Sequence, residues 1–179
     1  LAGKIATSLA LDSTALINTF NDSELQKKYG FTSSTFISLF LPNTYEVYYS
    51  ITAEEFVAKM AKEYKKFWNE ERLNRARALK MSQSEITTLA SIVYEEQKVK
   101  FDEQSKIAGL YLNRLKNNWL LQADPTVKFA LGDHTIKRVL VKHLEVESPY
   151  NTYRKAGVPP GPICLTEPRT NEAVLKKEI

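Results

Sequence analysis

The central part of the chain reads Ser84-Glu-Ile-Thr-Thr-Leu-Ala-Ser-Ile-Val-Tyr-Glu-Glu-Gln97. The apolar residues of this stretch recur at helical spacing, at Ile86, Leu89, Ala90 and Val93. Such spacing predicts a helix with one buried stripe. At about 100° per residue, Glu96 falls close to the centre of that stripe, and Glu95 falls on the opposite side, facing water.

We therefore expect the Glu96 carboxyl group to point inward. Loss of hydration there raises the pKa of a carboxyl group and lets it keep a proton near neutral pH. A protonated carboxyl group is what general acid catalysis requires. The alternative interpretation is a carboxylate that forms a salt bridge with Lys or Arg, or one that caps a loop.

Composition indicates an ordinary globular chain. Its 179 residues are enough for one large domain or two small ones, and 43% are hydrophobic and 26% charged. The net charge of +4 is too small to indicate nucleic-acid binding. We interpret the cations between Lys59 and Lys80 as a solvated helix face, and binding of an anionic polymer is the less favoured interpretation.

Several kinds of site are disfavoured by the sequence. No stretch approaches the roughly 18 apolar residues of a membrane span, and no signal peptide is present. His134 and His143 have no partner at ligand spacing, and the six glycines are scattered, so we expect no metal, no nucleotide and no other cofactor. The single cysteine, Cys164, is expected to be a buried inert thiol. Since the chain opens on Leu1 and not on Met, we expect a piece of a longer protein.

Local signals predict the order of the elements. Residues 1–35 favour short helices, and the β-branched and aromatic residues from Phe36 to Tyr49 favour two short extended pieces joined by a turn. Capping boxes at Thr52-Ala-Glu-Glu55 and Ser82-Gln-Ser-Glu85 predict the starts of two helices, the first running to about Leu79. Another helix is expected from about Asp102 to Lys116, with four residues inward: Ile107, Leu110, Tyr111 and Leu115. The rest favours loops with short strands or helical turns.

These elements predict an α+β fold. We expect a small N-terminal module of helices and strands at residues 1–52 and a connecting helix at residues 53–80. A helix-rich domain with loops and short strands follows at residues 81–179. If Glu96 is catalytic, this last part is the catalytic domain.

Short polar side chains downstream of Glu96 are of the type that hydrogen-bonds sugar hydroxyl and amide groups. They are Asn113, Gln122, Asp124, Asn151 and Tyr153. Asp124 has a second interpretation, because Asp-Pro is a common turn initiator.

Ordered motifs carry a resemblance to a known family. They are Leu89-Ala-Ser-Ile-Val-Tyr-Glu-Glu96, Ile107-Ala-Gly-Leu-Tyr-Leu-Asn-Arg-Leu115, Leu121-Gln-Ala-Asp-Pro-Thr-Val127, Ser148-Pro-Tyr-Asn-Thr-Tyr153 and Gly157-Val-Pro-Pro-Gly-Pro-Ile163. In this order they resemble the YceG-like family of endolytic murein transglycosylases. The resemblance covers about residues 36–175. Upstream, Leu41-Pro-Asn-Thr-Tyr45 resembles a further motif of the family, with Asn43 in place of the usual Asp. Two other departures are Tyr94, which replaces a typical acid, and the segment Gln97–Gln104, which is about one residue longer than usual.

The resemblance implies that Glu96 is the catalytic glutamate. It implies cleavage of peptidoglycan glycan strands between N-acetylmuramic acid and N-acetylglucosamine, which leaves a 1,6-anhydro end and needs no cofactor. The five polar residues above would then bind substrate, and the loop at Gly161 would shape the cleft wall.

The resemblance also has implications for the whole protein. Residues 1–52 would be a partial LysM-like module, and the family continues past the residues that match Asn171–Ile179, so the catalytic domain would be C-terminally truncated. A segment missing from this chain would anchor the protein in the cytoplasmic membrane, with the catalytic domain facing the periplasm or the exterior. Cell-wall synthesis enzymes would be partners.

Three other functions remain open. A peptidoglycan-binding or scaffold protein could keep the same fold without turnover. A glycoside hydrolase could use Glu96 as acid and Asp124 as base. A nucleic-acid-binding module is supported only by the basic charge, and we expect no nucleic-acid partner.

Overall fold

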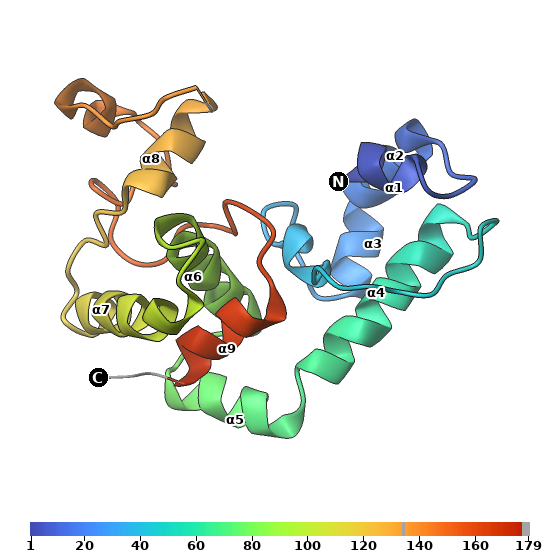
Figure 1. Ribbon diagram of the computed structural model, residues 1–179, viewed down its shortest axis with the longest axis horizontal. Helices are drawn as coiled ribbons and strands as arrows, with labels where there is room; N and C mark the ends of the chain where they lie inside the picture. The colour runs from blue at the N-terminus through green and yellow to red at the C-terminus, as the bar shows by residue number, and fades with distance from the viewer. Residues whose placement is uncertain (134, 177–179) are drawn as a thin grey trace.

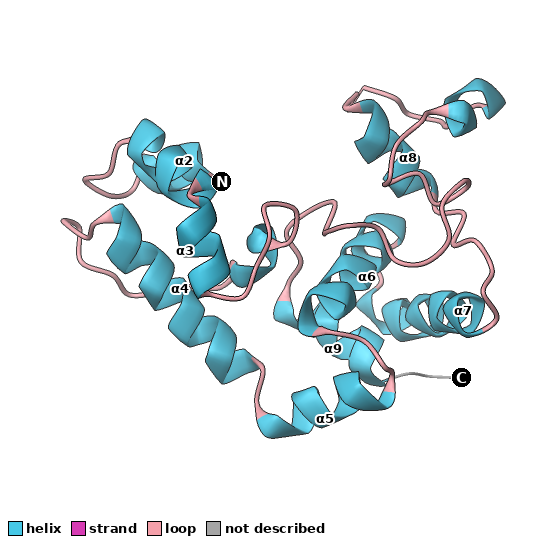
Figure 2. Cartoon of the chain, turned by 180° about the vertical axis from the view of Figure 1, so that it is seen from behind, coloured by secondary structure: helices cyan, strands magenta, loops and turns pink. Residues whose placement is uncertain are grey.

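The computed structural model describes residues 1–133 and 135–176. Within these two ranges the chain forms helices and loops, with no strand (Figure 2). The predicted α+β fold class is therefore wrong, and so is the strand-containing, LysM-like module at residues 1–52. The described part of the chain is all-α.

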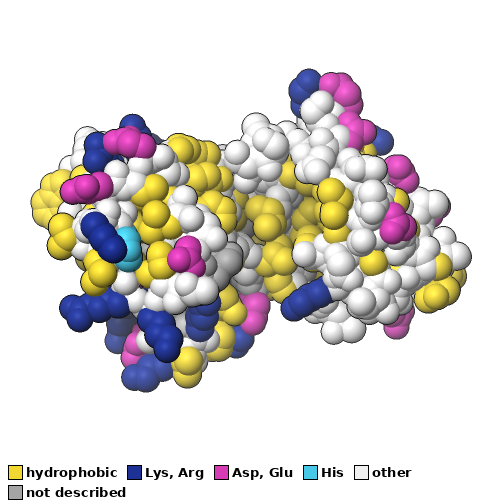
Figure 3. Space-filling view, turned by 90° about the horizontal axis from the view of Figure 1, so that it is seen from above, with side chains coloured by type: hydrophobic (Ala, Val, Ile, Leu, Met, Phe, Trp, Pro, Cys, Tyr) yellow, Lys and Arg dark blue, Asp and Glu magenta, His cyan; other side chains and the backbone are white. Residues whose placement is uncertain are grey.

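The helices form two lobes (Figure 1). The first lobe contains α1 (Ala2–Ala6), α2 (Ser13–Asn21), α3 (Ser23–Lys28), the 3-10 turn η1 (Phe36–Leu39) and α4 (Ala53–Phe67). The second contains α5 (Glu70–Ala78), α6 (Gln83–Glu96), η2 (Phe101–Glu103), α7 (Gln104–Lys116), α8 (Asp124–Leu131), η3 (Val141–Glu145) and α9 (Pro168–Lys176). Seen from above, a furrow with hydrophobic side chains separates the lobes (Figure 3).

The two extended pieces predicted between Phe36 and Tyr49 are replaced by η1 and an irregular segment. Phe36 and Phe40 are four residues apart, and both rings are buried on the same side, with centroids 5.5 Å apart. Both also contact Phe20 of α2, at 6.3 and 4.9 Å. Leu39, Phe40 and Leu41 are also buried in succession, whereas a half-buried strand would have sent alternate residues to opposite faces.

The single connecting helix expected from residue 53 to about 79 is two helices, α4 and α5. The break follows Trp68, whose side chain is buried, and Asn69 caps α5 by accepting a hydrogen bond from the Arg72 backbone N–H at 3.0 Å. The capping box at Thr52 predicted where the helix starts, and the Asn69 cap starts a new helix directly after the buried Trp68. The domain boundaries at residues 52 and 80 remain predictions.

Helix α6 forms as the sequence predicts. The capping boxes at Thr52 and Ser82 are both present, at the starts of α4 and α6. The apolar stripe of α6 is fully buried, at Ile86, Leu89, Ala90 and Val93. On α7, by contrast, Leu110 was expected inward but is 52% exposed.

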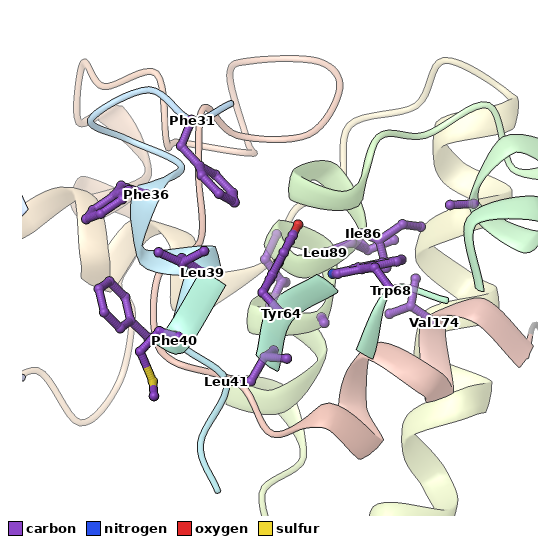
Figure 4. Close-up of a cluster of buried hydrophobic side chains, with 14 of the residues drawn as sticks. Phe31, Phe36, Leu39, Phe40, Leu41, Tyr64, Trp68, Ile86, Leu89 and Val174 are labelled. Atoms are coloured by element: carbon purple, nitrogen blue, oxygen red, sulfur yellow. The ribbon is translucent and has the colours of Figure 1, made fainter. Parts of the chain in front are cut away.

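A single core joins the two lobes (Figure 4). The aromatic cluster of the first lobe reaches Tyr64 through Phe31, with ring centroids 5.4 Å apart, and Tyr64 lies 6.2 Å from Trp68. The core then continues into α6 and α9 through Ile86 and Val174. Among the described residues, no helix has the length and apolar character needed to cross a bilayer.

Candidate active site

Glu96 is the last residue of α6, and the backbone turns to an extended conformation at Gln97. The Tyr111 hydroxyl of α7 donates a hydrogen bond to Glu96 Oε1 at 3.1 Å. Glu96 is exposed, however, whereas Glu95 is half-buried and pairs with Lys98 at 2.8 Å. The predicted order of burial is therefore wrong. Because α6 ends at Glu96, no further helical turn extends the buried stripe over its side chain.

Neighbouring groups nevertheless change the chemistry of the Glu96 carboxyl group. Its pKa is raised above the ordinary value, chiefly by partial desolvation and further by the negative charge of Asp124. The hydrogen bond from Tyr111 and the charge of Lys128 act in the opposite direction. Exposure of the side chain limits the size of the shift, because water screens these charges.

Asp124 and Tyr153 form a second pair beside Glu96. The Tyr153 hydroxyl donates to Asp124 Oδ1 at 2.6 Å. The pKa of Tyr153 is raised to about 12 by burial, by this hydrogen bond and by the charges of Asp124 and Glu96. Tyr153 therefore remains a neutral hydrogen-bond donor near neutral pH. The pKa values of Glu96, Asp124's partner Tyr153 and Tyr111 are therefore linked through charges and hydrogen bonds.

A buried network of two threonines fixes the start of α8. Thr152 Oγ1 accepts a hydrogen bond from the Ala123 backbone N–H at 2.9 Å and lies 2.8 Å from Thr126 Oγ1. The Gln122 N–H donates to the Thr152 carbonyl oxygen at 3.0 Å, while Gln122 adopts φ +52 and its side chain is exposed. This network holds Asp124 next to the turn that carries Tyr153.

Asn151 is fully buried, and backbone groups occupy its amide. Its Nδ2 donates to the carbonyl oxygens of Leu144 and Val146 at 2.9 and 2.8 Å, and its Oδ1 accepts from the Tyr153 N–H at 3.0 Å. In this structure Asn151 shapes the loop that presents Tyr153.

Two other predicted site residues lie elsewhere. Asn113 is exposed on α7 and lines a pocket of about 560 Å³ with residues from Ala78 to Met81, Gly157 and Val158. Gly161 packs against the first lobe, where an added Cβ would meet the Ser34 carbonyl oxygen at 1.9 Å. Gly161 thus permits a close backbone approach, but to Ser34. Neither this pocket nor a more apolar one of about 670 Å³ bordered by α1 and α4 includes Glu96.

Sequence reasoning missed Tyr111 and Lys128 as neighbours of Glu96. Tyr111 was predicted only as a core residue, and its ring is indeed buried. Lys128 had a usable signal, because it stands four residues after Asp124, on the same face of a helix. Their proximity to Glu96 depends on how α7 and α8 pack, which no local pattern encodes.

Other candidate chemistry is accounted for by local contacts. Burial raises the pKa of Cys164 to about 12, and its thiol lies 3.6 Å from the Ser91 carbonyl oxygen. His143 Nδ1 accepts from the Leu140 N–H at 3.1 Å, and His134 lies outside the described residues. In residues 1–133 and 135–176, no group of three or more potential metal ligands is found.

Comparisons with known proteins connect this geometry to a family. A model of the YceG-like family matches residues 3–178. A YceG-like protein of Listeria monocytogenes has a solved structure that superimposes with a TM-score of 0.77 at 31% identity, covering 99% of this chain and 63% of that one.

Two curated relatives are named endolytic murein transglycosylases. The protein of Bacillus subtilis strain 168 is 47% identical over 96 residues, which cover 54% of this chain and 26% of that protein. The protein of Streptococcus pneumoniae strain D39 is 28% identical over 130 residues, which cover 68% of this chain and 22% of that protein. The chain thus spans about a quarter of the length of these relatives. Since the family model covers nearly all of it, the chain belongs to the YceG-like family.

Proposed function

We propose that this chain is the catalytic part of a lytic transglycosylase that cuts peptidoglycan glycan strands internally, with Glu96 as general acid and then general base. The observation that carries the proposal is the Glu96 carboxyl group, hydrogen-bonded by Tyr111 and close to Asp124. Membership of a family whose curated relatives are named endolytic murein transglycosylases supports the choice of substrate.

In the first step, protonated Glu96 gives its proton to the glycosidic oxygen between N-acetylmuramic acid and N-acetylglucosamine. The C1–O bond breaks as an oxocarbenium-like state forms on the muramic acid. In the second step, the 6-hydroxyl of that sugar attacks C1 and Glu96 takes its proton. The product has a 1,6-anhydro end, and no water is consumed.

One glutamate suffices for this reaction because the nucleophile belongs to the substrate. The intramolecular attack has a high effective molarity, which replaces a protein nucleophile. The negative charge of Asp124 raises the pKa of Glu96 and would also favour the positive charge that develops on the sugar.

Other residues receive supporting roles in this proposal. Tyr153 orients Asp124, and the exposed Gln122 side chain is available to hydrogen-bond an N-acetyl group. Asn151 acts by shaping the loop of Tyr153, and Gly161 acts by joining the lobes. Asn113, in its separate pocket, could contact only a more distant part of a long strand.

The proposal has consequences for location and partners. Peptidoglycan lies outside the cytoplasmic membrane, so the catalytic domain has to face the periplasm or the exterior. A membrane anchor would have to come from a segment outside this chain, and enzymes of cell-wall synthesis are the partners that we propose.

The test is incubation of the chain with purified sacculi, followed by mass spectrometry of the released glycans. We expect 1,6-anhydro ends from the wild type and their loss in Glu96→Gln, with glycan binding retained. Glu95→Gln is the matched control, because it removes the neighbouring carboxylate of the same helix and should keep activity.

Each alternative gives a different product pattern. Glycan ends that are one water heavier would indicate a hydrolase and overturn the transglycosylase. Binding without any product from the wild type would indicate a scaffold protein.

A further inference from the structure

Tyr111 has no role in the reaction described above, yet its hydroxyl is hydrogen-bonded directly to Glu96 Oε1, at 3.1 Å. We propose that Tyr111 is a positioning residue that fixes the Glu96 carboxyl group and leaves Oε2 as the oxygen that exchanges the proton with substrate. This inference rests on the proposed function of Glu96.

The argument begins with the difference in mobility between the two side chains. Glu96 is exposed at the end of a helix, and a long side chain there has several rotamers of similar energy. The Tyr111 ring is only 5% exposed, and α7, which carries it, packs against α6 and α9. The fixed hydroxyl therefore selects one rotamer of the mobile carboxyl group.

The direction of the hydrogen bond decides which carboxyl oxygen carries the proton. Burial and the charge of Glu96 raise the pKa of Tyr111 far above its ordinary value, so its hydroxyl is a donor at every working pH. Oε1 accepts that hydrogen bond, and the proton of a neutral Glu96 then resides on Oε2. General acid catalysis needs this fixed placement relative to the glycosidic oxygen.

Besides Tyr111 of α7, charged and titratable groups from two further elements surround Glu96. Asp124 and Lys128 come from α8, and Tyr153 comes from the loop that follows η3. Among them, the Tyr111 hydrogen bond and Lys128 lower the pKa of Glu96, while Asp124 raises it.

The experiment replaces the hydroxyl alone, with Tyr111→Phe. The buried ring is kept, and water can reach the exposed Glu96, so the variant should fold. We expect kcat on soluble glycan oligomers to fall about 10-fold with KM little changed, because binding is retained while the acid loses its placement. The alkaline limb of the kcat–pH profile should move to higher pH, since the pKa of Glu96 rises when the hydrogen bond is lost. An NMR titration of the Glu96 side-chain carboxyl carbon should move in the same direction.

Tyr45→Phe is the matched control. Its hydroxyl donates to the Leu41 carbonyl oxygen at 2.6 Å in the first lobe, so it also removes one part-buried hydrogen bond. It should leave kcat, the pH profile and the Glu96 titration unchanged. An unchanged profile and titration in folded Tyr111→Phe would overturn the inference, even if Glu96→Gln is inactive. Full activity in Glu96→Gln would instead overturn the proposed function, and the NMR titration would still report whether Tyr111 controls Glu96.

Discussion

The properties of the Glu96 carboxyl group come from residues distant in sequence. Tyr111 supplies a hydrogen bond from α7, and Asp124 and Lys128 supply opposite charges from α8. Sequence periodicity placed Glu96 on the side of the apolar stripe, yet it gave the wrong degree of burial. A helical wheel gives the direction in which a side chain points around the helix axis. It does not show how far along the helix the neighbouring helices cover those side chains.

At this scale, Glu96 should make stability depend on pH. Its pKa is raised in the folded chain, so the folded state binds the proton more tightly than the unfolded state does. The stability contribution of Glu96 is then fully present below the unfolded pKa and is lost as pH rises through the folded pKa. We expect Glu96→Gln to melt at a higher temperature than wild type at pH 7, with the difference shrinking towards pH 4.

Glu95→Gln provides the control, because it removes the same charge but breaks the pair with Lys98 and should bring no stabilisation. Melting curves recorded between pH 4 and 8 would show the trend. A Glu96→Gln difference that does not vary with pH would contradict the expectation.

The elements show which signals in the sequence were reliable. The capping boxes at Thr52 and Ser82 and the stripe of α6 depend on neighbours within one or two turns, and they were predicted correctly. Residues 36–49 and the break at Trp68 were mispredicted. In both places the backbone takes the conformation that buries the aromatic side chains in the common core. Tertiary packing therefore overrides local propensity.

Helix α8 depends on the buried hydroxyl of Thr152. In Thr152→Val, the Ala123 N–H would remain buried without its partner, which costs about 1–3 kcal/mol. Because Asp124 follows Ala123 directly, glycan cleavage should fall as well. Thr152→Ser keeps the hydroxyl and should lose clearly less stability. Urea unfolding of the two variants measures the difference, and equal losses would show that the hydrogen bond to Ala123 does not matter.

Over the whole molecule, one core passes from the first lobe into the second through Tyr64 and Trp68 (Figure 4). The described chain should therefore unfold in one cooperative transition. Trp68→Ala should remove about 3–5 kcal/mol of stability, since it empties a buried site at the junction. Trp119→Ala is the control, because that side chain is 65% exposed and should cost little.

Circular dichroism and near-ultraviolet absorbance, followed in the same urea titration, would test this expectation. Wild-type transitions at different urea concentrations would mean that the lobes unfold separately.

At this scale the sequence motifs identified the family, but the assembly of the site could not be predicted. The threonine network ties the start of α8, with Asp124, to the loop that carries Tyr153, and α8 packs against α6, which carries Glu96.

The exposure of Glu96 also bears on how a long polymer could be engaged. A carboxyl group sunk in a closed tunnel can be reached only by a free chain end that threads inward. Under the proposed function, a strand would instead reach the exposed Glu96 at the end of α6 from the side, while both strand ends stay linked in the peptidoglycan. The position of the cut would then depend on contacts with the sugars along the strand and not on the distance from a strand end.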